Sequence, residues 1–314
     1  MQIISINEQE LERFLSLSDQ TNLERVNILR TDLLELWASG HSQPAWCFLA
    51  QENGSDRGRV AYRTIETPQE VFCFAVVLPW QADYLSVGQD LFHESLKRLA
   101  AQGIQLAQCQ VNSQWERVNE AQQVLTAVGF SLRQAKSGFV LMIPEMPVVV
   151  PDRLTYRTLA EVGEATFIEA IQQASADTLD SDDRKLIAQF GLQQAAENFF
   201  AFLQDDYFSY QPAWWQLAYA VDGALVGFVQ PVIFREIPHK GTIGYMGVVP
   251  AQRGHHYVDD LLLKAQRIFQ EEGVKELIDG TDSENFPMIG AFQRAGYKED
   301  GTNWIYQLAL TDNN

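Results

Sequence analysis

The sequence predicts an α/β protein with mixed sheets, built as two similar domains in tandem. Its 314 residues exceed the roughly 100–200 typical of one domain. Three prolines between Ile143 and Asp152 favour an extended, non-helical path, so we place the linker at residues 146–152 and the domains at 1–145 and 153–314. Both sides share one order: helix, glycine, strand, loop, helix, glycine–aromatic pair, strands. A duplication explains this order, although two unrelated α/β domains remain an alternative.

In the first half, the order begins with a helix and ends with a β-rich tail. An alternating run after Gly103 predicts a strand, and Gly129 follows the second, shorter helix. The predicted elements are a helix at Leu91–Ala101, a strand at Ile104–Val111, a helix at Asn119–Ala127 and a strand at Gly138–Ile143.

In the second half, Val258–Glu272 gives the clearest helix, because apolar residues recur at three- and four-residue steps. Gly273 suits the left-handed position after a helix, and Asp259 and Asp260 complement the helix dipole in its first turn. A turn at Asp222–Gly223 joins a hairpin. The other predicted strands are Leu154–Leu159, Trp215–Val221, Ala224–Phe234, Thr242–Val249, Val274–Ile278 and Asn303–Leu310, and the other helices are Glu164–Ala174, Lys185–Leu203 and Met288–Arg294.

The charge balance argues against nucleic-acid and membrane partners. Acids outnumber bases 41 to 23, a formal net charge of −18. A nucleic-acid binder needs a cationic face, and anionic membranes favour basic segments. We expect neither partner, and an acidic surface that serves solubility or attracts cations.

Cysteine usage and the first residues indicate a reducing compartment. Cys47, Cys73 and Cys109 lie in apolar or mixed runs without metal-ligand spacing, so we expect buried free thiols and no zinc site. The start of the chain has no basic segment followed by an apolar core, and no apolar run approaches 18 residues. We therefore expect a cytoplasmic protein.

The segment most indicative of chemistry is the corner Val248–Leu262. A buried strand runs through Pro250 into a short basic turn with Arg253 and Gly254, and a helix follows at once. The first amides of a helix have no internal partners and carry partial positive charge, so such a corner binds phosphate oxygens. Arg253 adds a cationic fork.

This corner resembles the signature of the GNAT superfamily, the acetyl-CoA-dependent N-acyltransferases. Val248, Pro250, Arg253 and Gly254 match the Val-x-Pro strand end and the Arg/Gln-x-x-Gly-x-Gly/Ala turn, and Asn285 and Gly296–Tyr297 match features downstream. The resemblance covers roughly Leu154 to Leu310. The first half is similar to the same fold in degenerate form, since no arginine follows Pro79.

The resemblance implies that acetyl-CoA is a co-substrate bound by the second half, without a metal. Its pyrophosphate would lie on amides between Arg253 and Val258, and its pantetheine arm between the ends of strands 242–249 and 274–279. The implied cofactor-binding residues are Met246, Gly247, Val248, Val249, Arg253, Gly254, His255, His256, Tyr257, Val258, Asn285, Met288 and Phe292.

Two residues depart from the family pattern at the cofactor turn. Glycines at the fourth and sixth motif places are His256 and Val258 here. His256 would either obstruct the phosphate or, when protonated, contact it. A metal role for the pair His255–His256 is disfavoured, because adjacent histidines point apart and no third ligand is spaced to join them.

The other departure concerns proton transfer. Phe292 stands where many members carry a tyrosine that protonates the leaving thiolate, and a phenyl ring cannot do so. Tyr245, on the strand beside the thioester, is our candidate for handling protons, and a core aromatic is the alternative interpretation.

Acidic residues near the expected acceptor site have two interpretations. Asp177, Asp180, Asp182 and Asp183 would attract an amine cation or form a solvated loop with a helix N-cap. For the later pair Asp279 and Asp282 we expect a turn role rather than a general base.

The function expected from the resemblance is transfer of an acetyl group from acetyl-CoA to a primary amine, within a ternary complex. The acceptor would be a small-molecule amine or a peptide amine. The first domain would be structural or shape the acceptor site. The alternative is a catalytically weak acyl-CoA sensor or a structural tandem module, because His256 and Phe292 weaken the catalytic interpretation.

Overall fold

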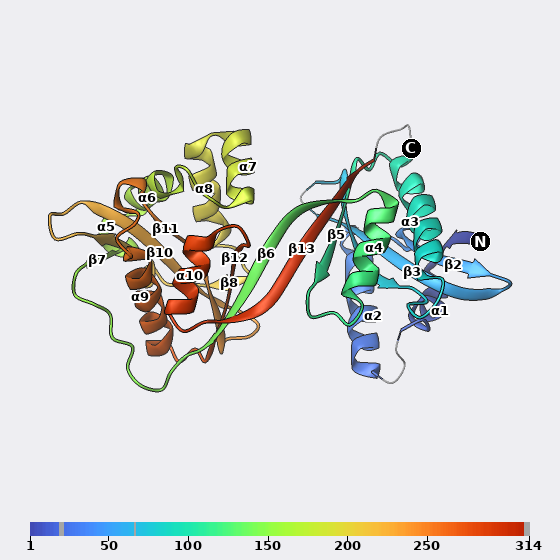
Figure 1. Ribbon diagram of the computed structural model, residues 1–314, viewed down its shortest axis with the longest axis horizontal. Coiled ribbons are helices and arrows are strands. Elements are labelled where there is room, and N and C mark those ends of the chain that lie inside the picture. Colours follow the sequence, from blue (N-terminus) through green and yellow to red (C-terminus); the bar gives the residue numbers. More distant parts are fainter. Residues whose placement is uncertain (19–21, 66, 311–314) are drawn as a thin grey trace. The chain divides into compact units, whose positions relative to one another are not determined.

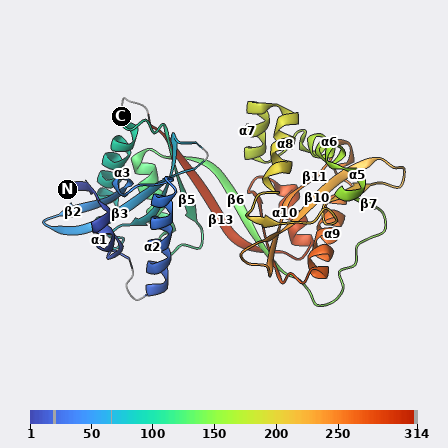
Figure 2. The same ribbon diagram turned by 180° about the vertical axis from the view of Figure 1, so that it is seen from behind.

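The computed structural model describes residues 1–18, 22–65 and 67–310, and the chain divides into two compact units. Unit 1 comprises Met1–Gln134 and the C-terminal segment from Asn303, and unit 2 comprises Ala135–Thr302. Figure 1 shows both units with their elements labelled, and Figure 2 shows them from behind.

Unit 1 contains a mostly antiparallel sheet with helices on both faces. Its strand order is β1-β2-β3-β4-β5-β13, and only β4 and β5 are parallel. One buried cluster includes residues of α1 and α2, and a second includes residues of α3 and α4. The elements are β1 (Gln2–Ser5), α1 (Leu11–Leu15), α2 (Leu23–Ala38), β2 (Cys47–Glu52), β3 (Ser55–Thr64), β4 (Glu70–Val77), α3 (Tyr84–Ala100), β5 (Leu106–Asn112) and α4 (Val118–Val128), with short 3₁₀ turns at Glu8–Glu10 and Pro44–Trp46.

Unit 2 repeats this design. Its strand order is β6-β12-β11-β10-β9-β7, β8 pairs with β10, and only β11 and β12 are parallel. In Figure 1, α6, α7 and α8 form one group of helices and α9 and α10 another. The elements are β6 (Ser131–Met142), β7 (Thr155–Thr158), α5 (Leu159–Val162), α6 (Glu164–Ser175), α7 (Ser181–Phe190), α8 (Leu192–Phe202), β8 (Phe208–Ser209), β9 (Gln216–Tyr219), β10 (Leu225–Phe234), β11 (Lys240–Val248), a 3₁₀ turn (Pro250–Gln252), α9 (Tyr257–Glu271), β12 (Glu276–Asp282), α10 (Phe286–Arg294) and β13 (Lys298–Ala309).

The predicted fold class, a mixed α/β tandem, is confirmed, and one predicted helix is wrong in its continuity. The stretch Lys185–Leu203 is two helices, α7 and α8, separated by Gly191 at φ 81°, ψ 161°. That backbone conformation is open essentially to glycine alone, and it breaks the helical hydrogen bonding there. Helix α9 lies within one residue of its predicted bounds, and Gly273 follows it at φ 78° as expected.

Each unit includes a strand from the sequence range that was predicted for the other domain. Residues 136–142 of β6 pair with β12 in unit 2, and Asn303–Ala309 of β13 pair with β5 in unit 1. The compact units therefore do not coincide with the predicted sequence ranges 1–145 and 153–314. An alternating apolar pattern specifies a strand but not its partner, so the sequence alone did not reveal this exchange.

Three further observations concern the chain as a whole. The cysteines Cys47, Cys73 and Cys109 are free and buried, as expected, and burial raises the pKa of Cys47 to about 12. Within the described ranges, no helix combines the length and apolar character needed to cross a membrane. In the same ranges, no group of three or more His, Cys, Asp or Glu side chains is arranged to hold a metal ion.

Candidate functional site

Two parallel strands at the centre of unit 2 separate after a short pairing. Strands β11 and β12 pair at two positions only, the second being Gly241 with Leu277. Beyond this point β11 continues to Val248 and β12 to Asp282. Their facing edges therefore carry backbone groups that no neighbouring strand uses, which is the arrangement that accepts an extended ligand.

A buried carboxylate stands where the two strands part. Asp279 on β12 accepts hydrogen bonds from the Thr242 hydroxyl (3.0 Å) and from the Ile243 amide (2.7 Å) on β11. Burial raises the pKa of Asp279. The turn role expected for Asp279 is wrong, since it lies within β12 and links the two strands at their last point of contact.

The backbone of β11 changes register just before the gap. Gln230 is opposite Tyr245 while Pro231 is opposite Ile243, which leaves Gly244 as an extra residue. Such a bulge bends the strand and re-aims the residues that follow it.

After the bulge, backbone groups alternate between β10 and the gap. The Val249 amide donates to Val226 O at 2.9 Å, so Val249 and Gly247 face β10. Because successive residues of a strand alternate, Met246 and Val248 direct their amides away from β10, toward the gap. Of the four strand residues predicted at the cofactor, these two carry the available amides.

The turn into α9 has the backbone that the motif needs. Gly254 has φ 85°, and His256, the N-cap, has φ 60°, ψ 21°. His256 thus adopts the left-handed conformation that glycine adopts most readily. Its side chain is 66% exposed and its Nδ1 lies 3.4 Å from a carboxylate oxygen of Asp259, so the imidazole is held at the surface. The amides of Tyr257 and Val258 open the helix, where no intrahelical acceptor exists for them.

Arg253 stabilises the corner through hydrogen bonds to backbone carbonyls. Its guanidinium donates to the carbonyls of Val248 (3.1 Å), Ala174 (3.1 Å), Ala176 (2.7 Å) and Asp177 (3.2 Å). Three of these acceptors are at the C-terminal end of α6 or just after it. In this structure Arg253 therefore fixes the corner against α6, whereas the motif had suggested a direct cationic fork for phosphate.

A second arginine, which the sequence analysis missed, holds the same turn from outside. Arg153 bonds Asp260 at 2.6 Å and donates to the carbonyls of His255 (3.2 Å) and His256 (3.1 Å), with its guanidinium carbon 5.1 Å from the centre of the Tyr257 ring. Asp260 is 1% exposed, so the pair is well shielded on its acidic side. An arginine just after the proline-rich segment, with an aspartate in a helix's first turn, was the signal available in the sequence.

The downstream residues predicted at the cofactor have structural roles here. Asn285 is the N-cap of α10: its side chain accepts from the Met288 amide (3.4 Å) and donates to Thr281 Oγ1 (3.0 Å). Phe292 is 3% exposed, with ring centres of Phe139 and Tyr297 at 4.8 and 4.9 Å. Phe292 thus belongs to the core, and Met288 packs against that core.

The predicted acidic loop spans the open ends of the two strands. At one end, Asp177 O accepts from Arg253 beside the end of β11. At the other, the Ser181 amide donates to a carboxylate oxygen of Asp282, the last residue of β12, at 2.7 Å. The segment 176–183 therefore borders the gap, which places its carboxylates beside the unpaired edges.

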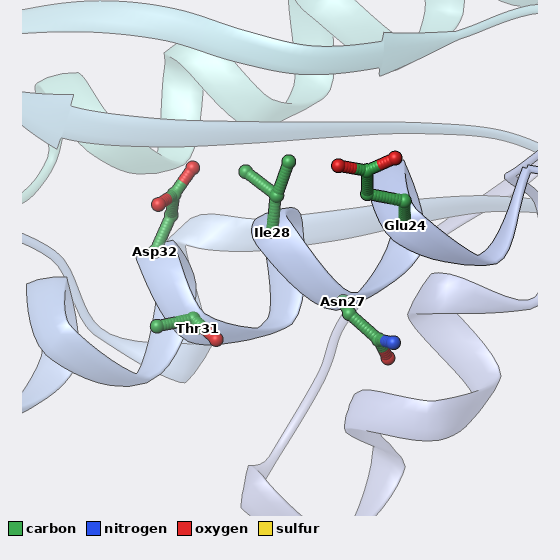
Figure 3. Close-up of a pocket in the computed structure, with 5 residues that line it drawn as sticks. All are labelled: Glu24, Asn27, Ile28, Thr31 and Asp32. Carbon is green, nitrogen blue, oxygen red and sulfur yellow. The ribbon is translucent and has the colours of Figure 1, made fainter.

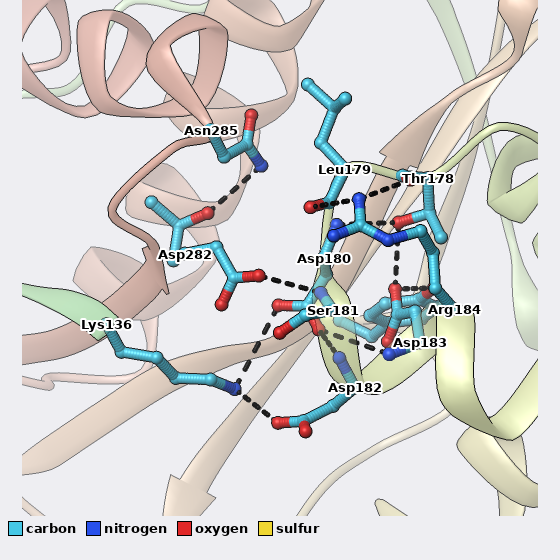
Figure 4. Close-up of polar contacts among 12 residues, drawn as sticks. Lys136, Thr178, Leu179, Asp180, Ser181, Asp182, Asp183, Arg184, Asp282 and Asn285 are labelled. Atoms are coloured by element: carbon cyan, nitrogen blue, oxygen red, sulfur yellow. Dashed lines mark hydrogen bonds and ion pairs between the residues drawn. The ribbon is translucent and has the colours of Figure 1, made fainter. Parts of the chain in front are cut away.

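Figure 4 shows the carboxylates around one lysine. Lys136 of β6 lies 3.0 Å from Asp182 and 3.9 Å from Asp180. Burial lowers the pKa of Lys136, but the two aspartates and Asp282 together raise it above its ordinary value. The N-cap role expected in this loop is confirmed for Asp180, which accepts from the amides of Asp182 (2.9 Å) and Asp183 (3.2 Å).

Asp183 and Tyr245 form a hydrogen-bonded pair. The sequence analysis had named each residue separately and did not predict their contact. The Tyr245 hydroxyl donates to Asp183 Oδ2 at 2.8 Å and lies 2.9 Å from Ser175 Oγ. Thr178 donates to the same carboxylate oxygen at 3.2 Å. Burial, and then the charge of Asp180, raise the pKa of Asp183 to about 6, while burial raises that of Tyr245 well above 10. Tyr245 is thus a core aromatic and a hydrogen-bond donor at once.

The equivalent corner of unit 1 has the same backbone conformation at the N-cap of its helix, but an acidic residue stands there. Asp83 is the N-cap of α3 at φ 62°, matching His256 in conformation. Its carboxylate lies 3.4 Å from Arg57. A carboxylate at this place repels a phosphate group, so unit 1 lacks the favourable electrostatics of the corner in unit 2.

A surface hollow in unit 1 offers no such chemistry. It has a volume of about 550 Å³ along α2, and its lining consists of five side chains of that one helix. Figure 3 shows Glu24, Ile28 and Asp32 along one side of α2, and Asn27 and Thr31 on another. Side chains of a single exposed helix face are not a convergent set, so we place the candidate site in unit 2.

Comparison with known proteins gives a family match that lies within unit 2. Residues 183–297 match the model of the acetyltransferase (GNAT) family, and no curated protein matches the chain significantly. A GCN5-related N-acetyltransferase from Sphaerobacter thermophilus has a TM-score of 0.63 at 15% identity, covering 98% of this chain and 95% of that one.

Two further solved structures share the fold. A tandem GNAT protein from the clavulanic acid biosynthesis pathway has a TM-score of 0.54 at 13% identity over 100% of this chain and 99% of its own. A glucosamine N-acetyltransferase region in a fungal multi-domain β-N-acetylglucosaminidase has a TM-score of 0.60 at 12% identity, covering 98% of this chain and 38% of that one. The shared fold extends over the whole tandem.

Proposed function

Because residues 183–297 match the model of the acetyltransferase (GNAT) family, we propose that unit 2 binds acyl-CoA, first of all acetyl-CoA, and transfers its acyl group to a primary amine. The observation that carries this proposal is the separation of β11 and β12 beside the N-terminus of α9. An unpaired strand edge and an anion-binding helix end together fit a ligand that has an extended amide-containing arm and a diphosphate.

In this proposal the residues of unit 2 hold the acyl-CoA as follows. The diphosphate lies on the amides between Arg253 and Val258, whose turn is fixed by Arg153 and Arg253. The pantetheine arm pairs with the free edge of β11. The amide of Met246 or Val248 polarises the thioester carbonyl, and a prearranged donor of this kind stabilises the charge that develops there.

The acceptor approaches from the acidic segment 176–183. Asp180, Asp182 and Asp183 of this segment, with Asp282, outnumber the basic side chains near them, Lys136 and Arg184, so a protonated amine is favoured over an anionic acceptor. Holding the amine and thioester together accounts for much of the rate that such an enzyme needs.

A direct test uses ligand binding followed by turnover. Acetyl-CoA and CoA should raise the melting temperature of the chain, with a stabilisation of about 2.7 kcal/mol at 100-fold saturation, and a nucleotide without the pantetheine arm should do less. Acetyl-CoA with a panel of cationic amines should then release free thiol. No stabilisation by acetyl-CoA would contradict the proposal.

One observation keeps a second function in view. Phe292 is buried in the core, so α10 offers no phenol at the place where many family members protonate the leaving thiolate. An acyl-CoA sensor would show the same stabilisation by acetyl-CoA but no thiol release with any amine, which separates the two functions.

A further inference from the structure

We propose that Asp183 is the catalytic base that takes the proton from the acceptor amine, and that Tyr245 and Ser175 are positioning residues that hold its carboxylate. This inference rests on the proposed acetyl transfer and names a catalytic residue for it. It starts from a hydrogen-bonded chain, Ser175–Tyr245–Asp183, with heavy-atom distances of 2.9 and 2.8 Å.

The carboxylate has one oxygen committed and one available. Asp183 Oδ2 accepts from Tyr245 and Thr178, whereas no described residue donates to Oδ1. The side chain is nearly buried, at 9% exposure, so a group that reaches Oδ1 meets a largely desolvated acceptor. Such a carboxylate is a stronger base than one in water.

The position of the chain connects it to the reacting edge. Tyr245 immediately precedes Met246, one of the two residues whose amides face the gap between β11 and β12. Asp183 is the last residue of the segment 176–183, which spans the open ends of these strands. Because the base and the proposed oxyanion donor come from adjacent elements at one gap, an amine held by Asp183 lies beside the thioester.

A second polar group on the same face lacks partners. Gln230 is opposite Tyr245 on β10, and in-register partners on neighbouring strands direct their side chains to the same face. Gln230 is 0% exposed, and among the described residues neither atom of its amide has a hydrogen-bond partner. Buried amides are normally satisfied, so this one marks a place for a polar ligand group or water beside Tyr245.

The proton steps balance as follows. Asp183 takes one proton from the ammonium of the acceptor, and the freed nitrogen lone pair forms a bond to the thioester carbonyl carbon. The C–S bond then breaks with its electron pair on sulfur, and a second proton from nitrogen gives the free thiol of CoA. Asp183 returns its proton to solvent, and the products are the amide and CoA.

Several charged groups face Asp183 and set its titration. Asp180 and Asp182 lie on its own helix or cap, Lys136 comes from β6, and the Tyr245 hydroxyl comes from β11. Burial and Asp180 raise the pKa of Asp183 to about 6, and the hydrogen bond from Tyr245 lowers it. We therefore expect the rate to rise with pH through about 6. When the hydrogen bond from Tyr245 is removed, this acidic limb of the pH–rate profile should shift to higher pH.

The experiment compares three variants in acetyl-CoA binding and in pH–rate profiles from about pH 5 to about pH 8. Asp183→Asn should lower kcat by about 10²–10⁴-fold without changing the affinity for acetyl-CoA. Tyr245→Phe should retain activity and shift the limb to higher pH. Asp177→Asn makes the same chemical change on the same loop, at an exposed residue that Asn suits because φ is 56°, and should leave the limb in place.

Each outcome decides one of the two claims. If acetyl-CoA fails to bind the unmodified chain, the proposed function is wrong. If acetyl-CoA binds but Asp183→Asn keeps kcat and the acidic limb, or no amine of the panel is acetylated at any pH, the assignment of Asp183 is overturned. An equal loss in Asp177→Asn would also overturn it, because loop charge rather than a base would then explain the effect.

Discussion

At the scale of single residues, Asp183 lowers the stability of the fold in which it has its proposed role. Its folded pKa of about 6 exceeds the ordinary 3.8. Below both values the carboxyl is protonated in both states and there is no penalty. Between them the unfolded chain ionises first, so ionisation favours unfolding as pH rises. Above 6 the full penalty applies, and it amounts to about 3 kcal/mol.

Replacing this residue should therefore stabilise unit 2 in a pH-dependent way. The free energy of unfolding of Asp183→Asn, measured relative to that of the unmodified chain, should be about 1–3 kcal/mol higher at about pH 8 than at about pH 4. Urea unfolding at several pH values measures the difference. A gap between the two proteins that stays constant with pH would contradict a raised pKa.

The sequence pointed to individual residues but not to the contacts between them. Tyr245 and the aspartates of the 176–183 segment were each singled out, but their hydrogen bond joins residues 62 positions apart. The Arg153–Asp260 pair joins residues 107 positions apart. No local pattern encodes such pairs, because they depend on which strand and helix ends the fold brings together.

At the scale of elements, strong periodicity gave reliable predictions. Helix α9 has an apolar stripe that is buried at Leu261, Leu262 and Ala265, and its bounds are within one residue of those predicted. The gap between β11 and β12 was expected from a family resemblance, and the structure shows the pairing end after two positions. The break at Gly191 was missed because a helical pattern continues on both sides of it.

The close approach of β10 and β11 requires a glycine at position 227. A Cβ on Gly227 of β10 would lie 2.1 Å from Gly247 O, whereas a Cβ on Gly280 of β12 would lie 3.4 Å from its nearest neighbour. Gly227→Ala must push β10 and β11 apart and should destabilise unit 2 by about 1–3 kcal/mol.

Gly280→Ala is the matched control for this change. Its new methyl group meets only an ordinary contact, so we expect an effect of less than about 1 kcal/mol. Denaturant unfolding of both variants provides the comparison. Equal stabilities would show that β10 and β11 tolerate separation at this point.

At the scale of the whole molecule, each unit contains a strand from the sequence range predicted for the other domain. Unit 2 takes its edge strand from residues 136–142, and unit 1 takes its last strand from Asn303–Ala309. The proline-rich segment lies between Met142 and Thr155, where the structure has no helix or strand. It did not mark the boundary of the compact units, because β6, the strand before it, pairs with β12 and belongs to unit 2 from Ala135 onward.

Cutting the chain within residues 143–152 tests this exchange. Two fragments, 1–145 and 146–314, should co-purify when expressed together, because each lacks a strand of its own sheet. Fragment 146–314 alone should aggregate or unfold, since β12 would have an unpaired edge. Size-exclusion chromatography measures both results, and two separately folded, non-associating fragments would contradict them.

The central claim is that the corner before α9 binds the diphosphate of an acyl-CoA, and calorimetric titration of acetyl-CoA tests it most directly. Gly254→Asp adds a carboxylate in the turn, at φ 85°, with no neighbouring atom within 4 Å of a new Cβ. Gly273→Asp makes the same change at φ 78°, at the far end of the same helix and again in open space. We predict one acetyl-CoA per chain, with affinity lowered at least about tenfold in Gly254→Asp and preserved in Gly273→Asp. Equal affinities in the two variants, or no binding by the unmodified chain, would contradict the account.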